Sequence, residues 1–260
     1  MIPRVLIVAG SDSGGGAGIQ ADIKTVTMLG GHAMTAVTAL TAQNTLGVQG
    51  VHPVPAAFVV EQMRSVLTDI GADAVKIGMI GSAETAHAVA DELERLDVPI
   101  VFDPVMVATS GSTLADADTI AAFERLMRIA SVVTPNLPEL AALGGEEAVL
   151  ALAPAVLVKG GHAEGMLIAD RLATRDGGGT VWSNHRIATR HTHGTGCTLA
   201  SAIATRLGEG RSLEDAVDAA IGFVRAAMTH APGLGRGAGP LGQGLTPHRL
   251  PPESPGPTLR

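Results

Sequence analysis

The chain alternates short runs of apolar, often β-branched residues with longer stretches in which apolar residues recur every three or four positions. The short runs predict strands at residues 5–8, 36–39, 74–77, 99–102, 131–133 and 156–158. The longer stretches predict helices at residues 17–29, 56–70, 83–96, 116–128, 195–207 and 213–230. Nearly continuous apolar strands are typical of a parallel sheet covered on both faces. The pattern therefore predicts an α/β protein, a three-layer α/β/α sandwich with a mostly parallel central sheet.

Two stretches depart from this alternation. Residues 166–174 and 180–190, joined through the glycine-rich stretch 176–179, predict an antiparallel β-hairpin at the edge of the sheet. Residues 146–153 predict a short crossover helix, close to the shortest that connects parallel strands. No linker interrupts residues 1–245, which we expect to form a single domain, whereas the Gly/Pro-rich residues 246–260 predict a disordered tail.

Composition narrows the class of ligand. The net charge is −7, and the Lys and Arg residues do not cluster, which argues against nucleic acid and anionic membranes as partners. No apolar run approaches the roughly 18 residues of a membrane span, and the chain begins with a strand rather than a signal peptide. The single cysteine allows no internal disulfide. These features predict a cytoplasmic protein that binds small molecules.

Candidate chemistry is densest where the helix at residues 195–207 begins. Gly194, Thr195 and Gly196 leave free backbone N–H groups at the positive end of the helix dipole, which predicts an anion site able to hold a phosphoryl group. Cys197 lies in the same turn, where the helix dipole is expected to lower the pKa of its thiol and make it a base or nucleophile. The alternative interpretation is a small buried hydrophobic residue.

Other polar residues follow the predicted strands. Residues 9–18 form a glycine-rich loop before a helix, which suits a small substrate or, with a weaker pattern, a nucleotide. The amide of Gln43 can read the edge of a heteroaromatic ring, or it can simply belong to a turn. Met79 and Val105 are candidate apolar walls for a flat ring, although isolated residues of this kind more often belong to the core.

Two further strand ends carry candidate phosphate and metal groups. Asn136 and Glu139 are three residues apart at a predicted helix start, where they can organise the water shell of a phosphate-bound Mg²⁺. The same spacing also fits a capping box. Lys159 follows the sixth predicted strand, where its charge can meet a nucleotide phosphate or point to solvent.

Seven motifs, in this order, resemble the hydroxymethylpyrimidine/phosphomethylpyrimidine kinases of the ribokinase-like superfamily, which are closely related to bacterial pyridoxine kinases. They are AGSDSGGGAGIQADIK (9–24), TALTAQNT (38–45), KIGM (76–79), DPVMV (103–107), TPNLPE (134–139), VKGGH (158–162) and HGTGC (193–197). The resemblance covers residues from about 4 to 242. Ser112 departs from it, since the family usually has an aspartate there.

The resemblance implies a ribokinase-like kinase of thiamine biosynthesis that uses ATP and Mg²⁺. It implies phosphorylation of 4-amino-5-hydroxymethyl-2-methylpyrimidine and then of the monophosphate, and it suggests a homodimer. For the substrate it implies Gln43, Gly10, Met79, Val105 and Asp22; for ATP and Mg²⁺ it implies Lys159, Asn136 and Glu139, with Asp103 as a further candidate metal ligand. The 194–197 turn becomes the anion hole, with Cys197 in place of the aspartate base of sugar kinases.

Two alternatives stay open at this point. The first is a kinase of pyridoxal or pyridoxine, because those rings also carry a hydroxymethyl group. The second is a non-catalytic pyrimidine sensor that kept the pocket and lost the chemistry. Gln43 and Met79 favour the pyrimidine, and the complete 194–197 turn with Lys159 argues against a mere sensor.

Overall fold

The computed structural model describes residues 1–107, 111, 114–162 and 165–245. Within them, one sheet has nine strands in the order β3-β2-β1-β4-β5-β6-β7-β8-β9. Their bounds are β1 Arg4–Asp12, β2 His32–Asn44, β3 Gly47–Pro53, β4 Ala74–Ile77, β5 Ile100–Phe102, β6 Val132–Val133, β7 Ala155–Val158, β8 Leu167–Thr174 and β9 Gly179–His185. The six strands from β2 to β7 across the sheet are parallel, so their carboxyl ends meet at one edge.

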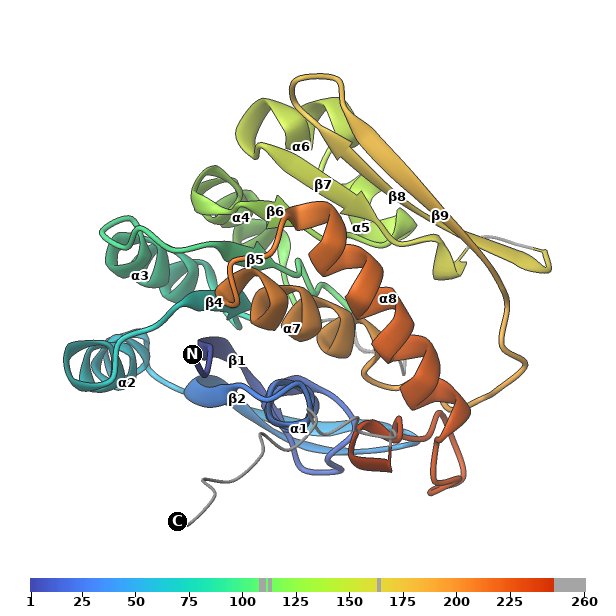
Figure 1. Cartoon of the computed structure of the whole chain (residues 1–260). Helices are drawn as coiled ribbons and strands as arrows, with labels where there is room; N and C mark the ends of the chain where they lie inside the picture. The colour runs from blue at the N-terminus through green and yellow to red at the C-terminus, as the bar shows by residue number, and fades with distance from the viewer. Residues whose placement is uncertain (108–110, 112–113, 163–164, 246–260) are drawn as a thin grey trace, which may run out of the picture.

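Helices cover both faces of this sheet, which confirms the predicted α/β/α sandwich (Figure 1). The helices are α1 Gly18–Met28, α2 Ala56–Asp69, α3 Ala83–Leu93, α4 Ala117–Ile129, α5 Leu137–Ala142, α6 Glu146–Leu152, α7 Thr195–Gly208 and α8 Leu213–Thr229. Alternate residues of β1 face opposite layers: Leu6 and Val8 pack with α2, α3 and α4, whereas Val5 and Ile7 pack with α1, α7 and α8. Burial on both faces explains why the strands are apolar at nearly every position.

The structure confirms the predicted hairpin, since β8 and β9 pair antiparallel at one edge of the sheet. It also confirms the short crossover helix, which is α6. The sequence pattern does not predict β3, which pairs antiparallel with β2 and forms the other edge. Two glycines and a terminal proline weaken the strand signal of β3, and most of its residues are exposed.

Two of the sequence-based expectations concern segments that the structure does not describe. The tail at residues 246–260 and Ser112 both lie outside the described residues. Among the helices that are described, none combines the length and the apolar character needed to cross a lipid bilayer.

We expect the face formed by α3 and α4 to contribute strongly to stability. Phe123 is fully buried and its ring meets Phe102 edge to face, with centroids 5.2 Å apart. Phe123→Ala should therefore lower the free energy of unfolding by about 3–5 kcal/mol in urea titrations. Phe58→Ala is the matched control: this ring is 54% exposed, so its loss should cost about 0.5 kcal/mol or less. Equal losses in the two variants would contradict the packing described here.

Candidate active site

The carboxyl ends of the parallel strands and the start of α7 enclose one cavity of about 890 Å³. This is the edge at which open parallel sheets bind ligands. Twelve of the thirteen residues that the sequence singles out line it: Gly10, Gln43, Met79, Asp103, Val105, Asn136, Glu139, Lys159, Gly194, Thr195, Gly196 and Cys197. The cavity thus brings together residues from six strand ends and one helix N-terminus.

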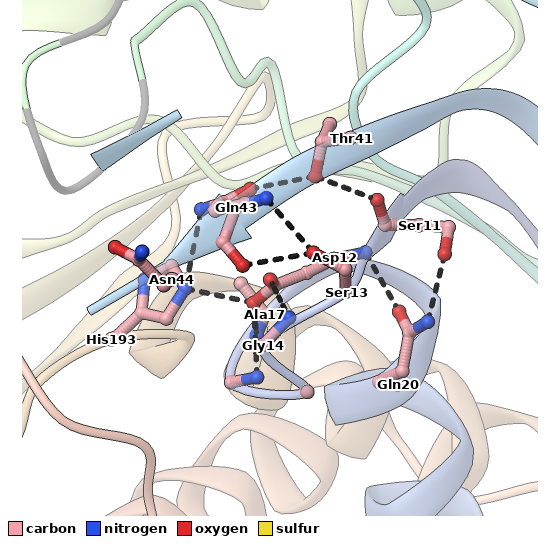
Figure 2. A network of polar contacts seen from close by, with 12 residues as sticks. Ser11, Asp12, Ser13, Gly14, Ala17, Gln20, Thr41, Gln43, Asn44 and His193 are labelled. Atoms are coloured by element: carbon pink, nitrogen blue, oxygen red, sulfur yellow. Dashed lines mark hydrogen bonds and ion pairs between the residues drawn. The ribbon is translucent and has the colours of Figure 1, made fainter. Parts of the chain in front are cut away.

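Asp12, at the end of β1, holds the loop that leads into α1 (Figure 2). Its carboxylate accepts hydrogen bonds from the backbone N–H groups of Gly14, Gly16 and Ala17 at 2.8–2.9 Å. Nε2 of His193 lies 2.9 Å from the same carboxylate. Burial alone would raise the pKa of Asp12, but the hydrogen bonds from His193 and the amides outweigh burial and hold it below its usual value. Asp12 therefore joins the loop before α1 to the turn before α7.

The turn before α7 can take its shape only with glycine. Gly194 is the N-cap residue of α7 and has φ +90°, a left-handed conformation that favours glycine. A Cβ atom on Gly194 would lie 2.0 Å from the carbonyl oxygen of Gly16, and one on Gly16 would lie 2.4 Å from Cδ2 of His193. The two backbones therefore touch. The N–H of Thr195 donates to the carbonyl oxygen of Thr192, and the first turn of α7 lines the cavity with the positive end of the helix dipole, which suits an anion.

Gln43 lies near the end of β2, where its side-chain amide is held in one orientation (Figure 2). Its Oε1 accepts a hydrogen bond from the Thr41 hydroxyl at 3.1 Å, and its Nε2 lies 3.3 Å from Nε2 of His193. Met79 closes the neighbouring wall, because a Cβ atom on Gly10 would meet Cε of Met79 at 2.3 Å. A polar amide beside a narrow apolar slot suits a flat ring with a hydrogen-bonding edge.

Lys159 lies on the cavity wall between two carboxylates. Its Nζ donates to Oδ1 of Asp103 at 2.7 Å and lies 3.7 Å from Oε2 of Glu139. Burial would lower the pKa of Lys159, but Asp103 and Glu139 outweigh burial and raise it. Burial raises the pKa of Glu139, although Lys159 partly opposes this. The lysine is thus kept charged at the place where a polyanion would enter.

Asn136 and Glu139 form the capping box that their spacing allows. Oδ1 of Asn136 accepts from the N–H of Glu139, and Oε2 of Glu139 accepts from the N–H of Asn136, both at 2.8 Å. Both side chains also line the cavity, so capping fixes their positions without removing them from the site. The capping box predicted from the spacing is therefore present, and the two side chains still lie where a ligand in the cavity can reach them.

The expectation for the thiol of Cys197 is wrong in direction. The residue lies in the first turn of α7 as expected, but burial raises the pKa of its thiol to about 11, although the cation of Lys76 opposes the increase. A helix N-terminus favours a thiolate only where the thiol keeps enough solvent or donors, and here the surrounding protein dominates. In the free protein the thiol is therefore neutral at neutral pH.

The expectation for Asp22 is also corrected. Asp22 is fully buried, is absent from the cavity wall, and binds Lys76 at 2.8 Å and the Ser201 hydroxyl at 2.7 Å. It lies on the buried face of α1 rather than beside the loop. The sequence analysis assigns no role to Asp12, His193 or Lys76. For Lys76 a signal was present, because a lysine is unusual within the otherwise apolar run of β4.

The described residues contain no cluster of three or more His, Cys, Asp or Glu side chains that would hold a metal by itself. A phosphate-bound Mg²⁺ needs fewer protein ligands, because it keeps several of its water ligands. Glu139 and Asp103 suit such an ion in their chemistry, since the cation of Lys159 already lies between their carboxylates. The Asp103 carboxylate is occupied by Lys159 and Thr134, so Glu139 is the better candidate.

The fold and the anion site at the end of a parallel sheet define a small-molecule kinase with a ribokinase-like fold, a class shared by the similar solved structures. Bacillus subtilis pyridoxal kinase, solved as an ADP complex, matches with a TM-score of 0.84 and 31% identity over 93% of this chain and 97% of that one. Phosphomethylpyrimidine kinase from Clostridium difficile matches with a TM-score of 0.74 and 34% identity over 86% of this chain and 98% of that one.

Sequence comparison gives the family. The model of the phosphomethylpyrimidine kinase family matches residues 12–242. The hydroxymethylpyrimidine/phosphomethylpyrimidine kinase of Streptomyces coelicolor is 48% identical over 93% of this chain and 94% of that protein. The chain spans only 36% of a similar thiamine biosynthesis multifunctional protein of Corynebacterium efficiens. The chain belongs to the phosphomethylpyrimidine kinase family, and it is a phosphotransferase.

The contacts of Asp12 lead to a prediction about stability. Asp12→Ala leaves three N–H groups without their acceptor, that of Gly16 buried and those of Gly14 and Ala17 partly buried, and should lower the free energy of unfolding at pH 7 by about 3 kcal/mol. Because the pKa of Asp12 is lowered by folding, this difference should be complete at neutral pH and disappear as the pH falls through the folded-state pKa. Urea titrations between pH 7 and pH 3 measure both effects.

Asp176→Ala is the matched control for this prediction. Asp176 also accepts a backbone N–H, from Gly178, but it lies in the exposed turn of the β8–β9 hairpin. Its loss should have a much smaller effect. A difference between wild type and Asp12→Ala that does not change with pH would contradict an ionised, hydrogen-bonded Asp12.

Proposed function

We propose that this chain transfers the γ-phosphoryl group of ATP to 4-amino-5-hydroxymethyl-2-methylpyrimidine and then to the resulting monophosphate, in thiamine biosynthesis. The observation that carries this proposal is the single cavity in which the ring-edge amide of Gln43 and the anion site at Gly194 meet. The relatives named for this activity, at 48% identity over nearly the full chain, support it. ADP in the structurally similar pyridoxal kinase supports a nucleotide as the donor.

The pyrimidine ring would lie between Met79 and Val105, over Gly10. Gln43 can donate from Nε2 and accept at Oε1, which matches an aminopyrimidine edge carrying a ring nitrogen and an amino group. The hydroxymethyl group would then point toward the start of α7. Pyridoxal kinases share the fold at a TM-score of 0.84, so the fold itself does not separate the two substrates. Sequence identity favours the pyrimidine kinases.

Positioning and charge neutralisation supply most of the rate in phosphoryl transfer. The N–H groups of the 194–197 turn would meet the oxygens of the transferred phosphoryl group, and Lys159 would neutralise charge along the triphosphate. As the hydroxymethyl oxygen forms its bond to the γ-phosphorus, the bond to the β–γ bridging oxygen breaks and ADP leaves. The thiolate form of Cys197, a minor fraction at neutral pH because the thiol pKa is about 11, takes the hydroxymethyl proton on Sγ and later releases it to solvent.

Glu139 and Asn136 would hold the water shell of Mg²⁺, with Lys159 beside them. When bound, the ion would neutralise phosphate charge. Two further expectations belong to this proposal: a homodimer and a cytoplasmic location. The β8–β9 edge hairpin is a candidate dimer contact because Leu167 and Val181 are exposed on it.

The decisive experiment incubates the purified protein with MgATP and, in separate reactions, hydroxymethylpyrimidine, its monophosphate and pyridoxal. Mass spectrometry should detect the pyrimidine monophosphate in the first reaction and the diphosphate in the first two. Phosphate transferred only to pyridoxal would overturn the assignment. Tight pyrimidine binding without transfer to any acceptor would instead identify a sensor.

Cys197→Ala tests the assigned base. Turnover with the alcohol substrate should fall by about 10²–10⁴-fold, the usual contribution of general base catalysis. Because the thiol pKa is about 11, the wild-type rate should rise about tenfold per pH unit from pH 7 toward pH 10, whereas the variant should lose this rise. Calorimetric ATP binding should be unchanged. Loss of nucleotide affinity would show that the thiol has a structural role only.

A further inference from the structure

A buried ion pair lies beneath the start of α7. Nζ of Lys76, in β4, lies 2.8 Å from Oδ2 of Asp22, in α1, and both side chains are fully shielded from solvent. The hydroxyl of Ser201, in α7, donates to the other carboxylate oxygen at 2.7 Å. Burial would lower the pKa of Lys76, but the neighbouring anions, Asp22 first, outweigh burial and raise it, so the amine is charged. Burial raises the pKa of Asp22, whereas Lys76 and the Ser201 hydroxyl oppose this increase and favour the carboxylate.

Stability does not account for this pair. β4 is otherwise apolar, and all four of its residues are buried. Charges in such a place are rare, and a buried ion pair is often replaceable by apolar residues without loss of stability. Of the two charged side chains, only that of Lys76 lines the active-site cavity, whereas Asp22 lies behind it.

Lys76 and Cys197 line the same cavity, and the charge of Lys76 acts there on the Cys197 thiol and on the Asp103 carboxylate. Burial raises the pKa of the thiol most, Lys76 is the strongest influence that lowers it, and Asp22 and Asp103 raise it. Lys159 is also close enough for the two charges to interact. The backbone N–H of Gly18, at the start of α1, faces the thiol and lowers the pKa as well. A buried cation and an N–H donor together form a site suited to a thiolate.

We propose that Lys76 is a positioning residue: its ammonium, held in place by Asp22, stabilises the thiolate of Cys197 and so allows Cys197 to take the hydroxymethyl proton. The kinetic part of this proposal rests on the function proposed above, whereas the coupling between Lys76 and Cys197 does not. The small space around Nζ, where a Cβ atom on Gly78 would lie 2.6 Å away, keeps the ammonium in one position.

The two phosphorylation steps should depend on Lys76 to different degrees. In the first step the alcohol loses a proton to the thiolate as its oxygen bonds to phosphorus and ADP leaves. In the second step the acceptor is a phosphate oxygen that is already ionised at neutral pH, so no proton has to be taken. Loss of the thiolate should therefore slow the first step and spare the second.

Cys197 is the only cysteine, so iodoacetamide labelling followed by mass spectrometry reports on this thiol alone. The labelling rate of the full-length protein should rise with pH up to the pKa of the thiol. Lys76→Met should shift this profile to higher pH and slow labelling by about tenfold or more at pH 9, since one pKa unit is a factor of ten. Asp22→Asn should shift the profile to lower pH.

Arg4→Met is the matched control. Arg4, at the start of β1, forms an ion pair at 2.6 Å with Asp73, directly before β4, so this pair lies at the opposite end of these strands from the cavity. Its loss should leave the labelling profile of Cys197 at the wild-type position. A shift as large as that of Lys76→Met would mean that any lost ion pair disturbs the thiol, and this would overturn the proposal.

The double variant Lys76→Met/Asp22→Asn covers the case in which a lone buried Asp22 prevents Lys76→Met from folding. It removes both charges, and because Lys76 affects the thiol more than Asp22 does, its profile should still shift to higher pH. Circular dichroism verifies the fold of each variant. A wild-type labelling profile in a folded Lys76→Met or double variant would overturn the proposal.

Steady-state kinetics form the last part of the test. Lys76→Met should lower kcat for the alcohol by about tenfold or more with little change in KM, and the double variant should lower it in the same direction but by less, because it also removes the opposing charge of Asp22. Transfer to the monophosphate should stay within about threefold of wild type, well short of one pKa unit. Equal losses in both steps would overturn the proposal. If neither pyrimidine is a substrate at all, the proposed function fails, while the labelling profiles still decide whether Lys76 controls the thiol.

Discussion

The active site depends on the close backbone contact between the loop before α1 and the turn before α7. Gly16 and Gly194 approach so closely that neither position has room for a side chain. The contact of Asp12 with His193 and its hydrogen bonds with the loop amides hold the two segments together. In the proposed reaction the first segment would hold the acceptor and the second the transferred phosphate, so this contact would set the distance between acceptor and donor.

Two lysines serve this site in different ways. Lys159 lies on the cavity wall with part of its side chain exposed, and its partners Asp103 and Glu139 are within reach of an entering ligand. It can exchange one anionic partner for another when a polyphosphate arrives. Lys76 is sealed in the core with Asp22 and has no route to such an exchange. The first lysine is thus suited to binding and the second to a fixed electrostatic field.

The sequence predicts most of the fold, because burial on both faces makes the parallel strands apolar without interruption, and it predicts the cavity because strand ends meet at one edge. The sequence-based prediction fails for features that depend on tertiary packing, because the local pattern of residues does not record that packing. The direction of the Cys197 pKa depends on how deeply the turn is buried, and the position of Asp22 depends on which face of α1 meets the core. The Asp12–His193 contact joins residues 181 positions apart, which spacing cannot reveal. β3 is missed because an exposed edge strand needs little apolar character.

The position of α7 in the chain has a consequence for synthesis on the ribosome. One face of β1, with Val5 and Ile7, packs against residues of α7 such as Ile203, which are made nearly 200 positions later. At about 5–20 residues per second, roughly 10 to 40 seconds pass between the synthesis of β1 and the synthesis of α7. The nascent chain must keep an apolar layer from aggregating during that time, and the anion site is completed by the same helix. The proposed anion site and the protection of this apolar layer are therefore acquired together, once α7 has been made.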